Sequence, residues 1–417
     1  MSETLFWKNK RILAWSLYDF ANQPFSTIVI TFLYGSFFVD EISKSPEDGT
    51  VMWSYSIAIT AILVALLSPI LGSIADRSGL RKFFLVSCTI ICSISTMLLY
   101  FPTYGDVYFA LTLFIIANIF FELGSVFCNS YLPDLTDSKN TGVVSGFAWG
   151  LGFIGGLIAL FFSYIFFDLN NSIEIRQVNI FVGLWFLFFS MPVFFFLNSE
   201  SIKTNKNLLK DSILEIKTTF KLISEYKIIF QFLISRLFFN DGLITIFGLG
   251  GIYALTTLNF SFNEIVILGV ILNIFAALGS FVFGYIEDRI GVKKVINISL
   301  LVLIFSTLIA YIAPETGYPK QLFWIAAILI GLMVGPNQSC SRSLMSKLIP
   351  SNKKNEFFGF FSFTGKVTAF IGPFLFGLIT DLYSQQAALW VVIFLFLIGF
   401  ILFNQIRFNS LNSQYEI

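Results

Sequence analysis

Histidine is absent from the 417-residue sequence, so proton relays and metal centres that depend on an imidazole are excluded. The four cysteines all fall within apolar stretches, which is typical of buried thiols rather than of disulfides or metal ligands. They are Cys88, Cys92, Cys128 and Cys340. We therefore expect no metal site and no cofactor.

Charged residues are also scarce, at 12% of the chain, and the 26 basic residues are balanced by 25 acidic ones. This balance gives no reason to expect a nucleic-acid partner. No phosphate-binding P-loop is present, which argues against ATP-driven pumping by this chain. Without histidine or a recognisable catalytic dyad, we do not expect an enzyme.

Apolar residues dominate instead: 56% of the chain is hydrophobic, it contains 53 phenylalanines, and the mean hydropathy of +0.81 far exceeds that of soluble domains. The apolar residues form runs of twenty or more and do not alternate with polar ones, so an outer-membrane barrel is excluded. The first run contains Asp19, Asn22 and Pro24. It is too long and too polar for a cleavable signal peptide, and we interpret it as an uncleaved first span.

Twelve membrane-spanning helices are predicted, which makes the chain an all-α polytopic membrane protein. The expected spans are residues 12–39, 52–74, 83–101, 107–131, 143–167, 178–198, 228–257, 264–286, 294–313, 321–346, 357–380 and 386–406. A polar stretch separates the sixth span from the seventh. We therefore expect an N-terminal six-helix bundle over 1–199, a cytoplasmic linker over 200–227 and a C-terminal bundle over 228–417.

The distribution of lysine and arginine predicts the orientation. Of the 26 basic residues, 21 lie in the tails or in the loops from an even-numbered span to the next odd one. The opposite loops hold only Lys44, Arg176 and Lys320. By the positive-inside rule, both termini are expected to be cytoplasmic, and a bacterial cytoplasmic membrane is the expected location.

A loop sequence recurs in the two halves of the chain. The segment 72–82, GSIADRSGLRK, returns 212 residues later as 284–294, GYIEDRIGVKK, each time after the second span of its half. The repeat indicates two related bundles. Its glycine permits a tight turn, and its aspartate can accept hydrogen bonds at a helix start or pair with arginine, so the loops are candidates for a cytoplasmic gate. The candidate gate residues are Gly72, Asp76, Arg77, Gly79, Arg81, Gly284, Asp288, Arg289, Gly291 and Arg342.

These loops resemble the signature of the major facilitator superfamily. Further motifs narrow the resemblance: YDFANQPF from residue 18, NSYLPD from 129, VSGFAWGLG from 144, RLFFNDG from 236 and EFFG from 356. Together they are similar to the largely unassigned bacterial subfamily that is related to the eukaryotic vacuolar amino-acid effluxers. The resemblance covers nearly the whole chain and implies solute transport by two pseudo-symmetric six-helix bundles.

Ionisable residues within the membrane are functional candidates, because burying a charge there is costly. The candidates for substrate binding or ion coupling are Asp19, Asn22, Glu122, Arg236, Asn240, Asp241 and Lys366. Fixed ion pairs that merely neutralise one another are the alternative. We expect Arg236 to face Asp19 or Glu122 rather than Asp241, because Asp241 points to another side of its helix.

Three acids against two bases leave one carboxylate without a cationic partner, unless Arg342 at the end of the tenth span supplies it. An unpaired carboxylate can carry protons in a chain without histidine. Pro24, Gly248, Gly250 and Gly251 mark weak points in the first and seventh helices, as expected where half-helices line a binding site. We therefore expect a proton-coupled secondary transporter for a small polar solute, with amino acids favoured, acting as a monomer in the lipid bilayer. A transporter-like receptor or scaffold, a uniporter and a channel remain alternatives.

Overall fold

The protein is represented by a computed structural model, which describes residues 9–169, 171–198, 208–221 and 225–407. Within these residues, twelve helical stretches are long and apolar enough to cross a membrane. They are Lys10–Ile42, Met52–Ser78, Arg81–Leu98, Val107–Leu135, Thr141–Phe166, Ser172–Phe196, Lys227–Thr256, Ile267–Ile290, Val292–Glu315, Pro319–Leu348, Lys354–Leu382 and Gln385–Asn404. The prediction of twelve spans is confirmed. The sixth begins six residues earlier than expected because the side chain of Asn171 caps its first turn by accepting from the backbone N–H of Ile173.

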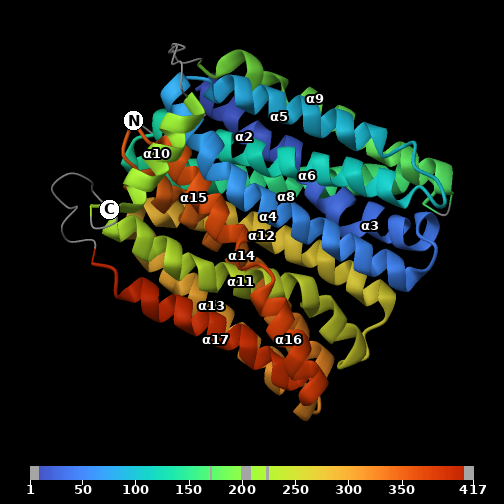
Figure 1. The fold of residues 1–417 in the computed structure, drawn as a ribbon. Helices are drawn as coiled ribbons and strands as arrows, with labels where there is room; N and C mark the ends of the chain where they lie inside the picture. The colour runs from blue at the N-terminus through green and yellow to red at the C-terminus, as the bar shows by residue number, and fades with distance from the viewer. Residues whose placement is uncertain (1–8, 170, 199–207, 222–224, 408–417) are drawn as a thin grey trace. The chain divides into compact units, whose positions relative to one another are not determined.

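The chain forms two compact units, and each draws on both halves of the sequence. Unit 1 consists of Met1–Tyr131, Leu151–Ile216 and Ser351–Ser362. Its helices are α2 (Lys10–Pro24), α3 (Tyr34–Phe37), α4 (Pro46–Ser78), α5 (Arg81–Leu98), α6 (Val107–Asn129), α9 (Ser172–Phe196), the end of α8 (Thr141–Phe166), the start of α10 (Leu208–Lys221) and the start of α15 (Lys354–Lys366). Within the unit, α9 packs on α2 and α5, and α6 packs on α4 and α5 (Figure 1).

Unit 2 consists of Leu132–Gly150, Lys217–Pro350 and Phe363–Ile417. Its helices are α7 (Leu132–Leu135), the start of α8, the end of α10, α11 (Lys227–Thr256), α12 (Phe262–Ile290), α13 (Val292–Ile312), α14 (Pro319–Leu348), the end of α15, α16 (Ile371–Leu382) and α17 (Gln385–Asn404). Within the unit, α14 packs on α12 and α13, and α17 packs on α11, α13 and α16. The predicted division of the chain at residues 199 and 228 remains a prediction.

The first span changes its winding at Pro24, as predicted. Proline has no backbone N–H and its ring clashes with the preceding turn, so it weakens the regular α-helical hydrogen-bond pattern. The chain is π-helical over Phe25–Phe32 and again over Phe38–Ile42. Wider turns of this kind occur mostly as interruptions near functional positions.

The expectation of a weak point in the seventh helix is wrong, because α11 runs unbroken past Gly248, Gly250 and Gly251. The break lies in the eleventh span instead, where residues 367–370 separate α15 from α16. Glycine lowers helix stability by only about 1 kcal/mol per residue, which the surrounding packing can offset. Proline at position 373 lacks an N–H, and it lies in the first turn of α16, where no N–H is needed.

The glycines of α8 pack closely on two different helices. A Cβ on Gly146 would lie 2.3 Å from the carbonyl oxygen of Ser280 in α12, and a Cβ on Gly155 would lie 2.4 Å from that of Phe20 in α2. Gly279 of α12 allows another close contact, since its Cβ would lie 2.0 Å from the carbonyl oxygen of Leu332 in α14. Small residues therefore allow close helix contacts in both units, as is common in membranes.

Candidate functional site

Asp76 lies near the end of α4 and caps the start of α15. Its Oδ1 accepts hydrogen bonds from the backbone N–H of Asn355 at 3.1 Å and from the side-chain amide of Asn355 at 2.7 Å. Its Oδ2 accepts from the backbone N–H of Glu356 at 2.8 Å. The first N–H groups of a helix have no partner within the helix and carry a partial positive charge, so a carboxylate is favourable there. We call this contact the first latch.

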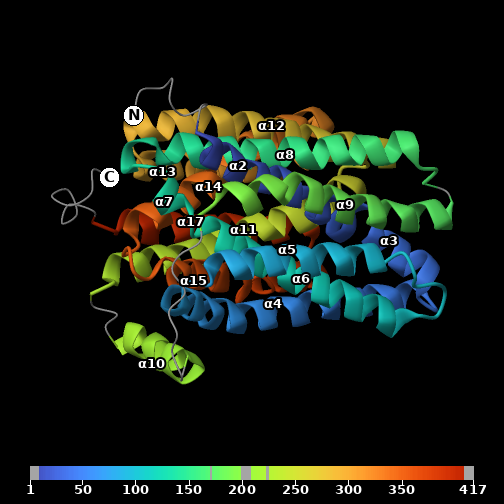
Figure 2. The ribbon, with the colours of Figure 1, turned by 90° about the horizontal axis from the view of Figure 1, so that it is seen from above.

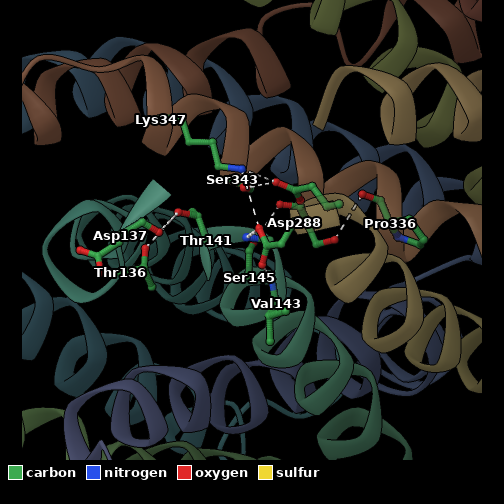
Figure 3. A network of polar contacts seen from close by, with 12 residues as sticks. Thr136, Asp137, Thr141, Val143, Ser145, Asp288, Pro336, Ser343 and Lys347 are labelled. Carbon is green, nitrogen blue, oxygen red and sulfur yellow. Dashed lines mark hydrogen bonds and ion pairs between the residues drawn. The ribbon is translucent and has the colours of Figure 1, made fainter. Parts of the chain in front are cut away.

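Asp288 makes the equivalent contact in unit 2, between the end of α12 and the start of α8 (Figure 3). Its Oδ1 accepts from the backbone N–H of Gly142 at 2.9 Å, and its Oδ2 from that of Val143 at 2.8 Å. A buried ion pair lies beside this second latch, where the Nζ of Lys347 is 2.9 Å from Oε1 of Glu287 and 3.9 Å from Oδ1 of Asp288.

The two latches follow the sequence repeat. The two aspartates are 212 residues apart, and the capped helix starts, Gly142 and Asn355, are 213 residues apart. Each aspartate caps a helix from the other half of the sequence, so the repeat describes a reciprocal contact. The sequence left open whether the aspartates bind a helix start or an arginine; the structure shows the helix start in both copies.

The glycines of the motif have two separate roles. Gly79 ends α4 with a φ of +70°, and Gly291 ends α12 with a φ of +91°, so these two make the tight turns. Gly72 and Gly284 lie inside their helices. A Cβ on Gly72 would be 2.3 Å from the carbonyl oxygen of Asn355, so this glycine allows the two helices to touch.

The basic residues of the predicted gate have several kinds of partner. Arg77 lies 3.9 Å from Asp211 of α10, and Arg289 contacts the hydroxyl group of Tyr285. Arg81 donates to the carbonyl oxygen of Ser130 at 2.9 Å and stacks on the ring of Tyr131. Arg342 in α14 donates from Nε to the hydroxyl group of Ser145 at 3.0 Å and from Nη2 to the carbonyl oxygen of Ser145 at 2.8 Å. Arg81 therefore joins neighbouring helices of unit 1, and Arg342 joins neighbouring helices of unit 2.

A polar cluster lies in the interior of unit 2, around the break in the eleventh span. Arg236 of α11 is buried, and its Nη1 lies 3.5 Å from Oγ1 of Thr364. One turn further, the amide of Asn240 donates to the carbonyl oxygen of Gly365 at 3.4 Å and accepts from the amide of Gln338 at 3.1 Å. The cluster therefore joins α11, α14 and α15 through a guanidinium and two amides.

Asp241 caps the second part of the broken span. Its Oδ2 accepts from the backbone N–H of Gly372 in the first turn of α16 at 2.9 Å. Its side chain is buried, and among the described residues its Oδ1 has no hydrogen-bond partner. A Cβ on Gly372 would lie 2.1 Å from the hydroxyl oxygen of Thr245, so this contact also requires glycine. Asp241 thus has one carboxylate oxygen available to a cation or a proton.

The remaining candidates are spread over both units. Asn22 is buried in α2, while Asp19 in the same helix and Glu122 in α6 are half-buried in unit 1. Lys366 is half-buried at the end of α15, where the break begins in unit 2. The pairing of Arg236 with Asp19 or Glu122 remains a prediction.

Sequence reasoning missed four residues of these sites. Glu287 and Lys347 form the ion pair beside the second latch, Gln338 orients Asn240, and the N–H of Gly372 binds Asp241. Glu287 was part of the repeated motif, but its counterpart in the first copy is Ala75, which gave no signal. The sequence GP at 372–373 was the only local sign of the break.

Comparison with known proteins places the chain among transporters. The family described as "Vacuole effluxer Atg22 like" matches residues 39–142 and 136–413. The uncharacterized MFS-type transporter YxiO of Bacillus subtilis is 29% identical over 402 residues, covering 93% of each chain. Autophagy-related protein 22 of Eremothecium gossypii is 25% identical over 477 residues, covering 97% of this chain and 91% of that protein.

Solved structures confirm the fold class. A bacterial homologue of the iron transporter ferroportin, in an outward-facing state, has a TM-score of 0.74 at 16% identity and covers 95% of this chain and 98% of its own. The proton:xylose symporter XylE has a TM-score of 0.74 at 13% identity and covers 95% of both chains. At these identities, the likeness shows the fold alone, which is that of the major facilitator superfamily.

Proposed function

The chain belongs to the vacuole effluxer Atg22-like family, and from this premise we propose that it is a secondary active transporter for a small polar solute. The family and the fold make it a multi-pass membrane transporter. The finer proposal is that it moves an amino acid or a similar metabolite by alternating access, driven by protons. Efflux is the favoured direction, in keeping with the description of the family.

The observation that carries this proposal is the polar cluster in unit 2. Arg236, Asn240 and Asp241 lie within two turns of one membrane-spanning helix, and all three side chains are buried. Buried charges inside a membrane protein are costly and usually mark the path of a substrate or an ion. A guanidinium suits a carboxylate, and a carboxylate oxygen with an open position suits an ammonium group. This combination fits a zwitterion such as an amino acid.

Proton coupling is assigned to Asp241. The chain has no histidine, so a carboxylate is the side chain best suited to take up and release a proton near neutral pH. Oδ2 of Asp241 is held by the start of α16 while Oδ1 has no hydrogen-bond partner among the described residues, which leaves a place for a proton. Protonation would weaken the attraction between this carboxylate and the positive start of α16.

The two latches supply the conformational part of the proposal. Each consists of a carboxylate on a helix start, a contact that can break and re-form without unfolding either helix. We propose that they close the cytoplasmic ends of the helices in one state and release them in the other. The basic loops would then lie in the cytoplasm of a bacterial cell, with both termini on that side and the monomer as the working form.

The test uses purified protein in lipid vesicles. A thermal-shift screen of amino acids and small metabolites would first identify a ligand. Vesicles with a pH gradient should then accumulate that ligand. Asp241→Asn should abolish this accumulation but keep the exchange of labelled for unlabelled ligand, because exchange needs no net proton movement.

The matched control is Asp381→Asn, which changes an exposed acid at the far end of α16 and should leave accumulation unchanged. Accumulation that persists in Asp241→Asn would remove Asp241 from the coupling role and turn attention to Glu122 and Asp19. Binding without exchange in the unaltered protein would favour the receptor alternative instead.

A further inference from the structure

The short helix α10 lies between the sixth and seventh spans, in a segment expected only to be a polar linker. It is attached to the end of α4 by two contacts. Arg77 lies 3.9 Å from Asp211, and the hydroxyl group of Ser73 donates to the carbonyl oxygen of Ser212 at 3.5 Å. Figure 2 shows α10 beside the last turns of α4.

The depth of this contact in the membrane follows from the position of Ser73 in its membrane span. Ser73 lies five residues before the end of the span Met52–Ser78, which corresponds to about 8 Å along the helix axis. The span has 27 residues and is about 40 Å long, whereas the hydrocarbon core is about 30 Å thick, so we expect its last turns at the level of the lipid headgroups. Gly72 and Asp76 face α15, and Ser73 and Arg77 lie about 100° further around α4. The contact with α10 therefore uses a different face of α4 from the first latch.

The helix has one buried polar side and one exposed mixed side. Ser212 and Thr219 are seven residues apart on one face and are fully buried. The opposite face carries exposed lysines together with apolar side chains, since Ile213 is 44% and Leu214 62% exposed. The exposed lysines are Lys210, Lys217 and Lys221. At about 100° per residue, these lysines lie about 140° to 180° from Ser212.

We propose that α10 lies in the headgroup layer of the membrane and binds anionic phospholipids. The three lysines would bind the phosphate groups, and Ile213 and Leu214 would enter the boundary with the acyl chains. Helices with a basic face and an apolar edge bind membranes in this way, through charge attraction combined with apolar burial. Because Asp211 is paired with Arg77, next to Asp76, lipid bound to α10 would also hold the part of α4 that makes the first latch. This inference does not depend on the identity of the solute.

The experiment places a fluorescent bimane on Leu214→Cys in full-length protein whose native cysteines have been replaced. The protein is reconstituted in nanodiscs of phosphatidylcholine, with or without phosphatidylglycerol. We expect nitroxide-labelled lipids to quench the probe, iodide in the water to quench it weakly, and phosphatidylglycerol to increase the lipid quenching. A probe on Tyr104→Cys, an exposed residue in the loop after α5, is the control and should respond equally in both lipids.

The matched variant changes Lys210, Lys217 and Lys221 to glutamine. Each lysine near an anionic surface contributes roughly a fivefold gain in affinity, so losing three should remove on the order of a hundredfold and abolish the phosphatidylglycerol effect. Strong iodide quenching with no lipid quenching would place α10 in water and overturn the proposal. Lipid quenching that is identical in both lipids would overturn the recognition of anionic headgroups. Quenching by neither reagent, as when another protein surface covers the helix, would overturn it as well.

Discussion

A single methyl group at Gly72 should open the first latch. The Cβ of an alanine there would lie 2.3 Å from the carbonyl oxygen of Asn355 and 2.7 Å from its carbonyl carbon, whereas ordinary contacts begin at 3.4 Å. Relief requires a movement of about 1 Å, and it cannot come from a side-chain rotation because the atoms belong to the backbone of α15. Overpacking of this kind costs about 1–3 kcal/mol. The closed arrangement of α4 and α15 should therefore lose about 5- to 150-fold in population.

Gly248→Ala is the matched control. It also places alanine inside a membrane-spanning helix, but its Cβ would have no atom within 4 Å. Both variants gain about 1 kcal/mol of helix propensity, so the difference between them isolates the contact with α15. We expect Gly248→Ala to keep or raise the thermal midpoint and Gly72→Ala to lower it.

The population of the latch can be measured by pulsed electron paramagnetic resonance. Spin labels on Phe83→Cys and Asn352→Cys would report the distance between the start of α5 and the segment before α15, and both positions are exposed. Gly72→Ala should reduce the short-distance fraction. Asp76→Asn, which keeps the volume but removes the charge, is a milder second variant if Gly72→Ala folds poorly. Equal distance distributions and equal midpoints in Gly72→Ala and Gly248→Ala would show that the contact of Gly72 with α15 does not hold the first latch closed.

Two further predictions concern single charges. Arg236→Lys keeps the positive charge but loses the planar guanidinium, so binding of an anionic or zwitterionic ligand should weaken about 5- to 100-fold in a thermal-shift titration; a loss of stability with unchanged affinity would make Arg236 structural. Glu264 caps α12 and lies 2.8 Å from Lys320, which lowers its pKa from 4.5 to about 2. Its contribution to stability is therefore complete above about pH 4.5 and is lost as the pH falls toward 2. Glu264→Gln should reduce the dependence of the thermal midpoint on pH between about pH 2 and pH 4.5. An unchanged pH dependence would contradict this role of Glu264.

The membrane spans could be predicted because the signal is local. A run of about twenty apolar residues must cross the bilayer whatever its neighbours are, so hydropathy alone located all twelve. Helix breaks are different. Gly248, Gly250 and Gly251 are poor helix formers, yet α11 continues through them, since in a membrane a helix satisfies its own backbone hydrogen bonds. The break at 367–370 is apolar and was invisible to hydropathy.

The hydrogen-bond partners of the repeated aspartates could not be predicted from the residue types in the sequence. Asp76 and Asp288 bind backbone N–H groups, which every residue except proline possesses, so the sequence of the capped helices carries no signature of the contact. What the sequence does carry is the symmetry of the repeat. Once one latch was known, the offset would have identified the other. The third capped helix, at Asp241 and α16, lies outside the repeat and needed the structure.

The two latches share their geometry, and each has an ion pair beside it. At the first latch the Nζ of Lys353 is 3.1 Å from Oε2 of Glu356, and at the second the Nζ of Lys347 is 2.9 Å from Oε1 of Glu287. A buried ion pair adds little net stability compared with apolar packing, but losing one partner leaves a buried charge and costs about 3–5 kcal/mol. Both latches should thus be sensitive to the loss of a single charge from the neighbouring ion pair.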